Sequence, residues 1–383
     1  MGVFVLNKEK YFAAINTGAG FAGYFDRIFD ASALNELYVI KSGPGTGKSS
    51  MMKRIAEAAE NANHKVVYFY CSSDPYSLDG ILIPSLSFGV LDGTSPHMTD
   101  PKYPKAADTV LDFYPYIDEK TVRARRDEVI ALTDKNRTLH KKSSSYRRYA
   151  ALAAREAFYA LRECIDIEKL QAAVKRTADA IKAGKGRAEH RQISAFSTKG
   201  KVTLKTFENT AKTKIGICDE HGCAYLFLNG LKNALIKKHV LFYYSLDTLL
   251  PERCEAIFIP SSGEYYRMTG TMANTDRRDY DKLINMKRFI KTDVLKDIRG
   301  RLRMCEKIRD TLDSEALRLI AEAGRVHDRL EALYNNAVDF DGVRAATDRM
   351  IELRIAICEA LDCQPGDILE YAPDDEKPAE NIS

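Results

Sequence analysis

The sequence predicts an α/β fold in which a parallel sheet with flanking helices occurs twice, each copy followed by a long helical segment. Three observations predict this arrangement. A glycine-rich turn joins a short apolar run to a helix-forming stretch within residues 37–63, as in a strand–turn–helix unit. Local patterns of the first half recur in the second half in the same order. Stretches whose composition or apolar spacing favours helices follow both repeats.

The glycine-rich turn at residues 42–49 reads SGPGTGKS. It matches the phosphate-binding P-loop pattern G-x-x-x-x-G-K-[ST], except that Ser42 replaces the first glycine. Ser42 is compatible with this role if its φ stays negative. Gly43, Gly45 and Gly47 let successive backbone N–H groups face a polyphosphate without a Cβ in the way. The following helix points its positive N-terminal end at the same anion. The alternative is a glycine-rich turn without a ligand.

The motif therefore predicts a P-loop NTPase core. The nucleotide-binding candidates are Gly43, Pro44, Gly45, Thr46, Gly47, Lys48, Ser49 and Ser50. Lys48 would contact the β and γ phosphates, and the Ser49 hydroxyl would bind Mg²⁺. An aspartate at the end of a second apolar strand normally completes such a site, and residues 88–92 have that form. Asp92 is thus a candidate for catalysis and for metal binding. The alternative is that Asp92 only forms a turn together with Gly93.

Many ATPases place a glutamate after this aspartate to orient the attacking water, but here Gly93 follows. That group must come from elsewhere. An apolar run at residues 66–70 leads to Asp74, and parallel sheets gather ligands at such carboxyl ends. Asp74 is therefore the first candidate for this catalytic role, with Asp79 and His97 behind it. The alternative for each is a helix cap or a turn residue.

The second half aligns with the first at a shift of about 175 residues that drifts by a few positions. The aligned segments are 16–20 with 196–200, 47 with 222, 66–74 with 240–247, 81–84 with 257–260, 92–94 with 269–271, and 156–170 with 331–343. In the second copy, Cys223 and Ala224 replace the P-loop lysine and serine. Asp219 and Glu220 add negative charge there, and residues 269–271 lack a carboxylate. We therefore expect a degenerate second site with a structural or regulatory role, or a pocket for another ligand.

The expected domains are a P-loop α/β core at 1–116, a helical segment at 117–187, a degenerate α/β core at 188–286, a second helical segment at 287–371 and a tail at 372–383. Apolar residues from Leu295 to Leu312 recur every three or four positions, the stripe of an amphipathic or coiled-coil helix. Helical hairpins flanking each core are the simplest arrangement. The polar, acidic and proline-bearing tail is expected to be disordered.

Composition limits the compartment and the partners. The net charge of +4 arises from 58 basic and 54 acidic residues, and this near balance disfavours a general nucleic-acid or membrane surface. Eight cysteines without zinc spacing indicate reduced thiols, although Cys71 could be reactive. With neither a signal-peptide core nor a membrane-span run, a cytoplasmic protein is expected. A basic cluster at residues 123–148 is either a solvated helix face or a contact surface for a polyanion.

The strings GPGTGKSS at 43–50, CSSDPYSLDGILIP at 71–84 and LDGTSPHMTDPKYP at 91–104, with the T-x-x-G-F element at 17–21, resemble an uncharacterised bacterial family of duplicated P-loop ATPases. Its members are usually described only as ATP-binding proteins or NTPases. The resemblance covers nearly the whole chain and implies ATP binding in the first core, with Lys48 and Ser49 in their usual roles. Family members tend to have a recognisable second P-loop, which this chain lacks. No substrate follows from the resemblance.

The leading expectation is a cytosolic Mg²⁺-dependent ATPase in which the nucleotide state moves the helical segments or the inactive second core. One alternative is a nucleotide or small-molecule kinase in which Asp74 or Asp79 accepts the proton of an acceptor hydroxyl. Another is a nucleotide-gated scaffold that binds a protein partner through its helices. No guanine-reading N-K-x-D string is present, and ATP and GTP remain undistinguished.

Overall fold

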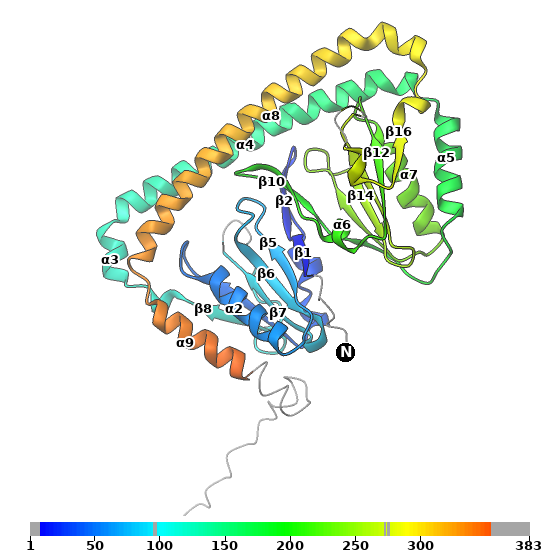
Figure 1. Ribbon diagram of the computed structural model, residues 1–383. Coiled ribbons are helices and arrows are strands. Elements are labelled where there is room, and N and C mark those ends of the chain that lie inside the picture. Colours follow the sequence, from blue (N-terminus) through cyan, green and yellow to red (C-terminus); the bar gives the residue numbers. More distant parts are fainter. Residues whose placement is uncertain (1–7, 95–97, 272, 274–275, 354–383) are drawn as a thin grey trace, which may run out of the picture.

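The computed structural model describes residues 8–353, apart from 95–97, 272 and 274–275. It is a mixed α/β structure with two six-stranded sheets (Figure 1). In spatial order, the first sheet consists of β1 (Glu9–Phe12), β5 (Val67–Tyr70), β6 (Leu78–Ile83), β7 (Phe88–Asp92), β4 (Glu36–Lys41) and β8 (Asp108–Asp112). The second consists of β9 (Ala188–His190), β13 (Phe242–Leu246), β14 (Cys254–Ile259), β15 (Glu264–Thr269), β12 (Thr213–Cys218) and β16 (Lys282–Asn285). The two orders correspond strand for strand, as two copies of one unit require.

The sheets are not all parallel, and this part of the prediction is wrong. In the first sheet, β4 pairs in parallel with β7 and β8, and β1 with β5, but β6 runs antiparallel to β5 and β7. The connections at residues 71–77 and 84–87 are too short for the crossover that a parallel pair needs, so they form hairpins. The second sheet repeats the antiparallel pairs, including a register shift at the same place.

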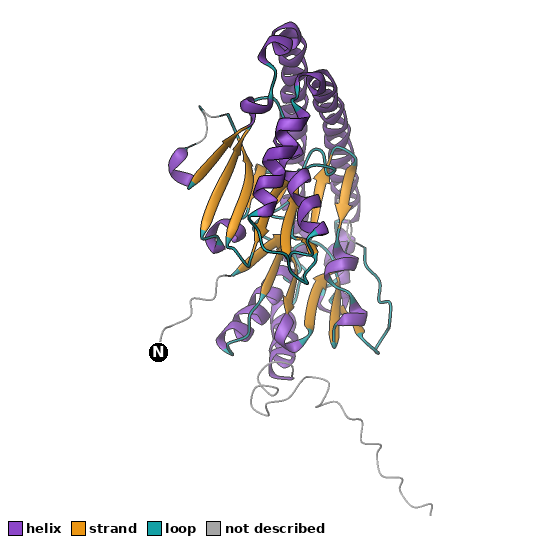
Figure 2. Ribbon diagram, turned by 90° about the vertical axis from the view of Figure 1, so that its right-hand side faces the viewer, coloured by secondary structure: helices purple, strands orange, loops and turns teal. Residues whose placement is uncertain are grey.

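Two long helices form one antiparallel pair that runs past both sheets (Figures 1 and 2). They are α4 (Arg126–Leu161) and α8 (Thr292–Asn335). Their seam is apolar, with Leu132 and Leu139 packed against residues of 319–330. Across it, the Asn136 amide donates to the Ala323 carbonyl oxygen at 2.8 Å. The expected helical hairpin beside each core is therefore wrong: each long helix has its partner in the other copy.

The shorter helices complete an exchange between the copies. They include α2 (Lys48–Asn61), α3 (Glu119–Ala124), α5 (Ile167–Asp179), α7 (Ala224–Lys237) and α9 (Phe340–Ile351). The helix α5 follows the first core but packs on α7 of the second, where Val174 contacts Gly230. In turn, α9 follows the second core but packs on α2 of the first, through Val343 and Met350. Each helical segment therefore ends on the other copy's core.

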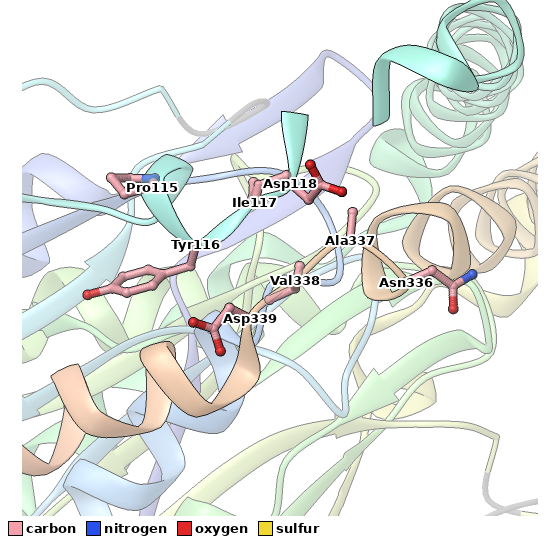
Figure 3. A pocket seen from close by; sticks show the side chains of 8 residues that line it. All are labelled: Pro115, Tyr116, Ile117, Asp118, Asn336, Ala337, Val338 and Asp339. Carbon is pink, nitrogen blue, oxygen red and sulfur yellow. The ribbon is translucent and has the colours of Figure 1, made fainter. Parts of the chain in front are cut away.

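A short main-chain pairing marks each exchange. Val338, between α8 and α9, forms an antiparallel bridge with Ile117, and the Asp118 N–H donates to the Ala337 carbonyl oxygen at 2.7 Å. Figure 3 shows the open groove of about 390 Å³ that these two segments line. At the other end, Ile165 forms the equivalent bridge with Ile290. The chain thus crosses onto each core at a hydrogen-bonded position.

The two cores also contact each other directly. Tyr11 of β1 lies with its ring centroid 6.1 Å from that of Phe207, within an apolar cluster built from both copies. Small hairpins, β2 (Ala14–Thr17) with β3 (Gly20–Gly23) and β10 (Ser194–Ser197) with β11 (Gly200–Thr203), make reciprocal contacts. The Gly18 N–H donates to the Leu249 carbonyl oxygen, and the Thr198 N–H donates to that of Ser73. The β2–β3 hairpin therefore contacts the loop after β13 of the second sheet, and the β10–β11 hairpin contacts the loop after β5 of the first sheet.

Arg147 of α4 lies at the junction of the long helices and the second core. Its guanidinium donates to Asp313 of α8 at 2.8 Å and to the Thr248 carbonyl oxygen at 2.7 Å, and it stacks over the Phe196 ring at 3.9 Å. The residue is 2% exposed. Replacing a buried, paired charge leaves its partners without compensation.

We expect Arg147→Ala to lower the free energy of unfolding by about 3 kcal/mol, the low end of the cost of breaking a buried ion pair. Arg148→Ala is the matched control, because the neighbouring Arg148 is exposed. Urea denaturation followed by circular dichroism measures the difference. Equal stability of the two variants would contradict a structural role for Arg147.

Candidate functional site

The glycine-rich turn at residues 42–49, called the P-loop below after its sequence pattern, connects a strand to a helix as that pattern predicts. It joins β4 to α2, which begins at Lys48. Gly45 and Gly47 have φ of +67° and +86°, conformations that favour glycine. Among the described residues other than glycine, positive φ occurs at Asn63, Ser87, Lys105 and His239. Ser42 thus keeps the negative φ that its place in the motif requires. Its hydroxyl donates to Thr46 Oγ1 at 2.7 Å, and the Thr46 hydroxyl donates to the Gly43 carbonyl oxygen at 3.0 Å.

Lys48 and Asp92 lie together. The strand β7 is the direct neighbour of β4, and its register pairs Ile40 with Asp92. Lys48 Nζ is 3.7 Å from Asp92 Oδ2 and donates to the Gly43 carbonyl oxygen at 2.6 Å. The other carboxylate oxygen of Asp92 accepts from the backbone N–H and the hydroxyl of Thr94. Asp92 therefore both stabilises a turn and faces the P-loop lysine.

Ser49 faces the same edge of the sheet. Its hydroxyl oxygen accepts the backbone N–H of Leu78, the first residue of β6, at 3.0 Å. A hydroxyl oxygen has two lone pairs, so one is left for another partner. No group of three or more metal-ligating side chains occurs among the described residues. A Mg²⁺ ion at Ser49 and Asp92 would therefore depend on phosphate oxygens and water, as is usual for this metal.

Of the two aspartates considered for proton transfer, Asp79 belongs to this cluster. The antiparallel ladder of β6 and β7 pairs Gly80 with Leu91. Asp79 precedes Gly80 and Asp92 follows Leu91, so the two aspartates lie side by side at the end of this strand pair. Asp79 is 3% exposed. Burial, followed by the negative charge of Asp92, raises its pKa to about 8. It is thus protonated at neutral pH, while remaining close to ionisation.

Asp74 instead lies in an exposed turn after β5, where its carboxylate accepts the backbone N–H of Tyr76 at 3.1 Å. The turn interpretation therefore describes its position in this structure. Cys71 is half-buried, and burial raises the pKa of its thiol well above the ordinary value, which disfavours a reactive thiolate. His97 lies outside the described residues.

Residues that sequence reasoning missed lie directly over the P-loop. A Cβ added to Gly43 would lie 2.8 Å from the Tyr334 ring, and one added to Gly45 would lie 2.7 Å from Asn335 Oδ1. These side chains belong to the last turns of α8. A Cβ added to Gly47 would lie 3.6 Å from the Phe340 ring of α9. Only the exchange of helices brings these residues to the site, and no local sequence signal predicts it.

The second core has an internal carboxylate at the equivalent position. Asp219 accepts the backbone N–H of Ala224, the first residue of α7, at 2.6 Å and that of His221 at 3.0 Å. The turn between β12 and the left-handed Gly222 spans residues 219–221, against 42–46 in the first core. The shorter turn and its own carboxylate occupy the place where a phosphate would bind.

One detail of the predicted alignment is wrong. Matching the registers of β4 with β7 and of β12 with β15 places Met268 opposite Ile217, just as Asp92 lies opposite Ile40. The counterpart of Asp92 is thus Met268 and not Thr269. Short D-G-T and T-G-T strings align by their letters, whereas the hydrogen-bond ladder fixes the register. The carboxylate is absent from the second core in either alignment.

The basic cluster of α3 and α4 is extensively paired. The ion pairs are Arg123 with Glu119, Arg125 with Glu128, Arg126 with Asp127, Lys135 with Glu322, Arg137 with Asp134 and Arg147 with Asp313. Apart from Arg147, which is buried, these pairs favour the solvated helix face over a polyanion surface. Within the part of the chain that the structure describes, no helix has the length and apolar character to cross a membrane.

Comparison with known proteins gives one short match. A family model described as a Cro/C1-type HTH DNA-binding domain matches residues 355–374, which lie outside the described residues. This short segment does not assign the 383-residue chain to that family. Searches of curated proteins and of solved structures gave no match.

The buried carboxyl of Asp79 makes stability depend on pH. Its pKa is about 8 in the folded protein, against an ordinary value of 3.8, so the folded state holds a proton that the unfolded state loses. Its stabilising effect is complete below about pH 4 and is lost as the pH rises towards 8. We expect Asp79→Asn to gain several kcal/mol relative to the wild type over this range, because each pKa unit is worth about 1.4 kcal/mol.

Thermal unfolding at pH 5, 6, 7 and 8 measures this difference. Asp74→Asn is the control, because it makes the same chemical change at an exposed aspartate five residues away. A constant difference between Asp79→Asn and the wild type across the series would contradict the raised pKa.

Proposed function

We propose that the first core binds Mg-ATP and hydrolyses it, and that the nucleotide state is coupled to the helices packed on the P-loop. The observation that carries this proposal is the convergence of three parts at one edge of the sheet. They are the P-loop with its two left-handed glycines, Lys48 at the start of α2, and Asp92 at 3.7 Å from that lysine. Backbone N–H groups, a lysine and a carboxylate for the metal form the usual equipment for binding a nucleoside triphosphate.

In this proposal, Lys48 binds the β and γ phosphates, and Ser49 and Asp92 hold Mg²⁺. When bound, Mg²⁺ would neutralise charge that develops on the transferred phosphoryl group. Asp79 is our candidate for accepting the proton of the attacking water, because it is buried beside Asp92 and its pKa of about 8 lies near physiological pH. Only its ionised form can accept the proton, and the positive charge of Mg²⁺ bound at the neighbouring Asp92 would favour that form. It replaces Asp74, whose carboxylate caps an exposed turn.

Coupling to the helices follows from the contacts over the P-loop. Gly43 and Gly45 touch α8, and Gly47 touches α9. A bound polyphosphate requires space at the same glycines. Since α8 extends to the second core, a displacement at its end would also strain the long helix pair.

A kinase is the second candidate, because Gly93 stands where a water-orienting glutamate would follow Asp92. The same Asp79 would then accept the proton of an acceptor hydroxyl. Incubation with ATP labelled in the γ-phosphate, with and without nucleotide and small-molecule acceptors, distinguishes the two. Label released as inorganic phosphate supports the ATPase, and label in an acceptor supports the kinase. Tight binding without either product would favour a nucleotide-gated scaffold.

We expect Lys48→Ala to abolish Mg²⁺-dependent ATP binding and to lower phosphate release by about 100-fold or more, as loss of a positioned charge at a transition state does. Asp92→Asn should retain more binding than Lys48→Ala but lose turnover. Lys53→Ala is the matched control: this lysine lies on the same helix, and its Nζ donates to the Tyr76 carbonyl oxygen.

Calorimetric titration with ATP and GTP in Mg²⁺, together with a phosphate-release assay, measures both effects and the base preference. The proposal would be wrong if neither nucleotide bound the wild type in the presence of Mg²⁺. Equal binding and turnover in wild type and Lys48→Ala would place any activity outside this site.

A further inference from the structure

A groove lies beside the P-loop, on the side away from Asp92. In the sheet, β4 has β7 as one neighbour and β8 as the other. On the β7 side, the N–H of Gly93 donates to the Ile40 carbonyl oxygen at 3.0 Å. On the β8 side, the N–H of Phe113 donates to the Lys41 carbonyl oxygen at 2.9 Å. The segment that follows β8 therefore starts next to the residue that precedes the P-loop.

Residues 115–118 of this segment form one wall of the groove of about 390 Å³, and residues 336–339 form the other wall (Figure 3). The second wall also borders the P-loop. Asn335, the residue before it, lies over Gly45. Phe340, the residue after it, has an exposed ring beside Gly47. Each wall is thus joined by one or two residues to a contact with the P-loop or with the strand that leads into it.

Tyr116 gives the groove an aromatic surface. Its ring centroid lies 5.9 Å from that of Phe113, and a Cβ on Gly342 of α9 would lie 2.8 Å from the ring. The residue is half-buried, so this packing holds the ring in place and leaves part of it accessible. Aromatic rings stack on nucleic-acid bases of any sequence, because every base has a π-face. The volume of the groove lies within the range of small-molecule sites.

The second core has the same crossing of segments, but there the ring is buried. The Asp339 N–H donates to the Tyr116 carbonyl oxygen at 2.8 Å, and the Asp166 N–H donates to the Phe289 carbonyl oxygen at 2.8 Å. Phe289 is therefore the counterpart of Tyr116. It is 2% exposed and belongs to the apolar cluster of the second core. The copy without the P-loop lysine thus buries this ring, whereas the copy with the lysine leaves it accessible.

Given the nucleotide site proposed above, we propose that this groove binds the nucleoside of the bound triphosphate, with the base stacked on the Tyr116 ring. The metal candidates Ser49 and Asp92 lie towards β6 and β7, so the γ-phosphate belongs on that side of the P-loop. The rest of the ligand then extends along the crevice at the carboxyl ends of the strands, towards β8. One wall of the groove comes from the first copy and the other from the connection after α8, so a bound nucleotide would contact both copies.

The first test separates the base from the phosphates by calorimetric titration of the full-length protein with ATP and with inorganic tripolyphosphate, both in Mg²⁺. Tyr116→Ala should bind ATP about tenfold more weakly, within the range for loss of one base–aromatic stack, and should bind tripolyphosphate like the wild type. Tyr116→Phe keeps the ring and should bind both ligands like the wild type. Tyr149→Ala is the matched control, because it makes the same change at an exposed tyrosine of α4.

The second test locates the base directly. Irradiation of the wild type with 8-azido-ATP in Mg²⁺, followed by mass spectrometry of the peptides, should place the label within residues 113–119 or 335–343. Excess ATP should prevent this labelling. Label confined to residues 71–79 would overturn the inference, because the base would then lie on the Asp92 side of the P-loop.

The binding data distinguish the groove from the nucleotide site itself. Equal ATP affinity in the wild type and Tyr116→Ala would overturn the inference and leave the nucleotide site standing. A parallel loss of ATP and tripolyphosphate binding in Tyr116→Ala would also overturn it, because the ring would then support the P-loop and not the base. Binding of neither ligand to the wild type would reject the nucleotide site and the groove together.

Discussion

The pairing of α4 with α8 is the interaction on which the rest of the structure depends. Two amphipathic helices gain stability by burying their apolar stripes, and here each buries its stripe against the helix from the other copy. Because the pair is antiparallel, α4 starts at the first core and ends at the second, and α8 makes the return. The helices that follow, α5 and α9, are then delivered to the opposite cores. A pairing within each copy would leave the P-loop without α8 and α9 above it.

The two cores also show what a duplicated fold keeps and what it changes. Both sheets have a register shift between the second and third strands in spatial order, and a buried acidic residue occupies the shifted position in each, Asp79 and Glu255. In the second core, Lys201 of the small hairpin neutralises Glu255 at 2.8 Å. In the first, the positive charge of Lys48 lowers the pKa of Asp79, against the larger effects of burial and of Asp92 that raise it. One copy has a direct ion pair between its hairpin and its sheet, whereas the lysine of the other copy lies 3.7 Å from a second carboxylate, that of Asp92.

Local features could be predicted from the sequence. The strand–turn–helix unit with Gly45 and Gly47, the tolerance of Ser42 and the strand that carries Asp92 depend on residues close together in the chain. The repeat became visible by comparing such local stretches between the two halves. Asp79 and not Asp74 lies beside Asp92 for a geometric reason that the sequence did not reveal: a short hairpin reverses β6 and brings Asp79 to Asp92, whereas Asp74 stays in the exposed connection. The helix exchange could not be predicted either. An apolar stripe on α4 or α8 is compatible with packing on a helix of the same copy as well as on a helix of the other copy. Amphipathicity shows that a helix needs a partner but not which one.

The turns that precede α2 and α7 show a more general constraint. A helix N-terminus with free N–H groups needs an anion or a solvent shell. The second core supplies that anion from its own shortened turn, through Asp219, and can therefore pack an apolar helix end over it without a ligand. The first core keeps the full-length turn, in which Gly45 and Gly47 have the left-handed conformation and no aspartate corresponds to Asp219. An aspartate introduced within residues 42–46 would supply an acceptor to the N–H groups at the start of α2 from inside the turn, as Asp219 does for α7, and would exclude an external anion from the same groups.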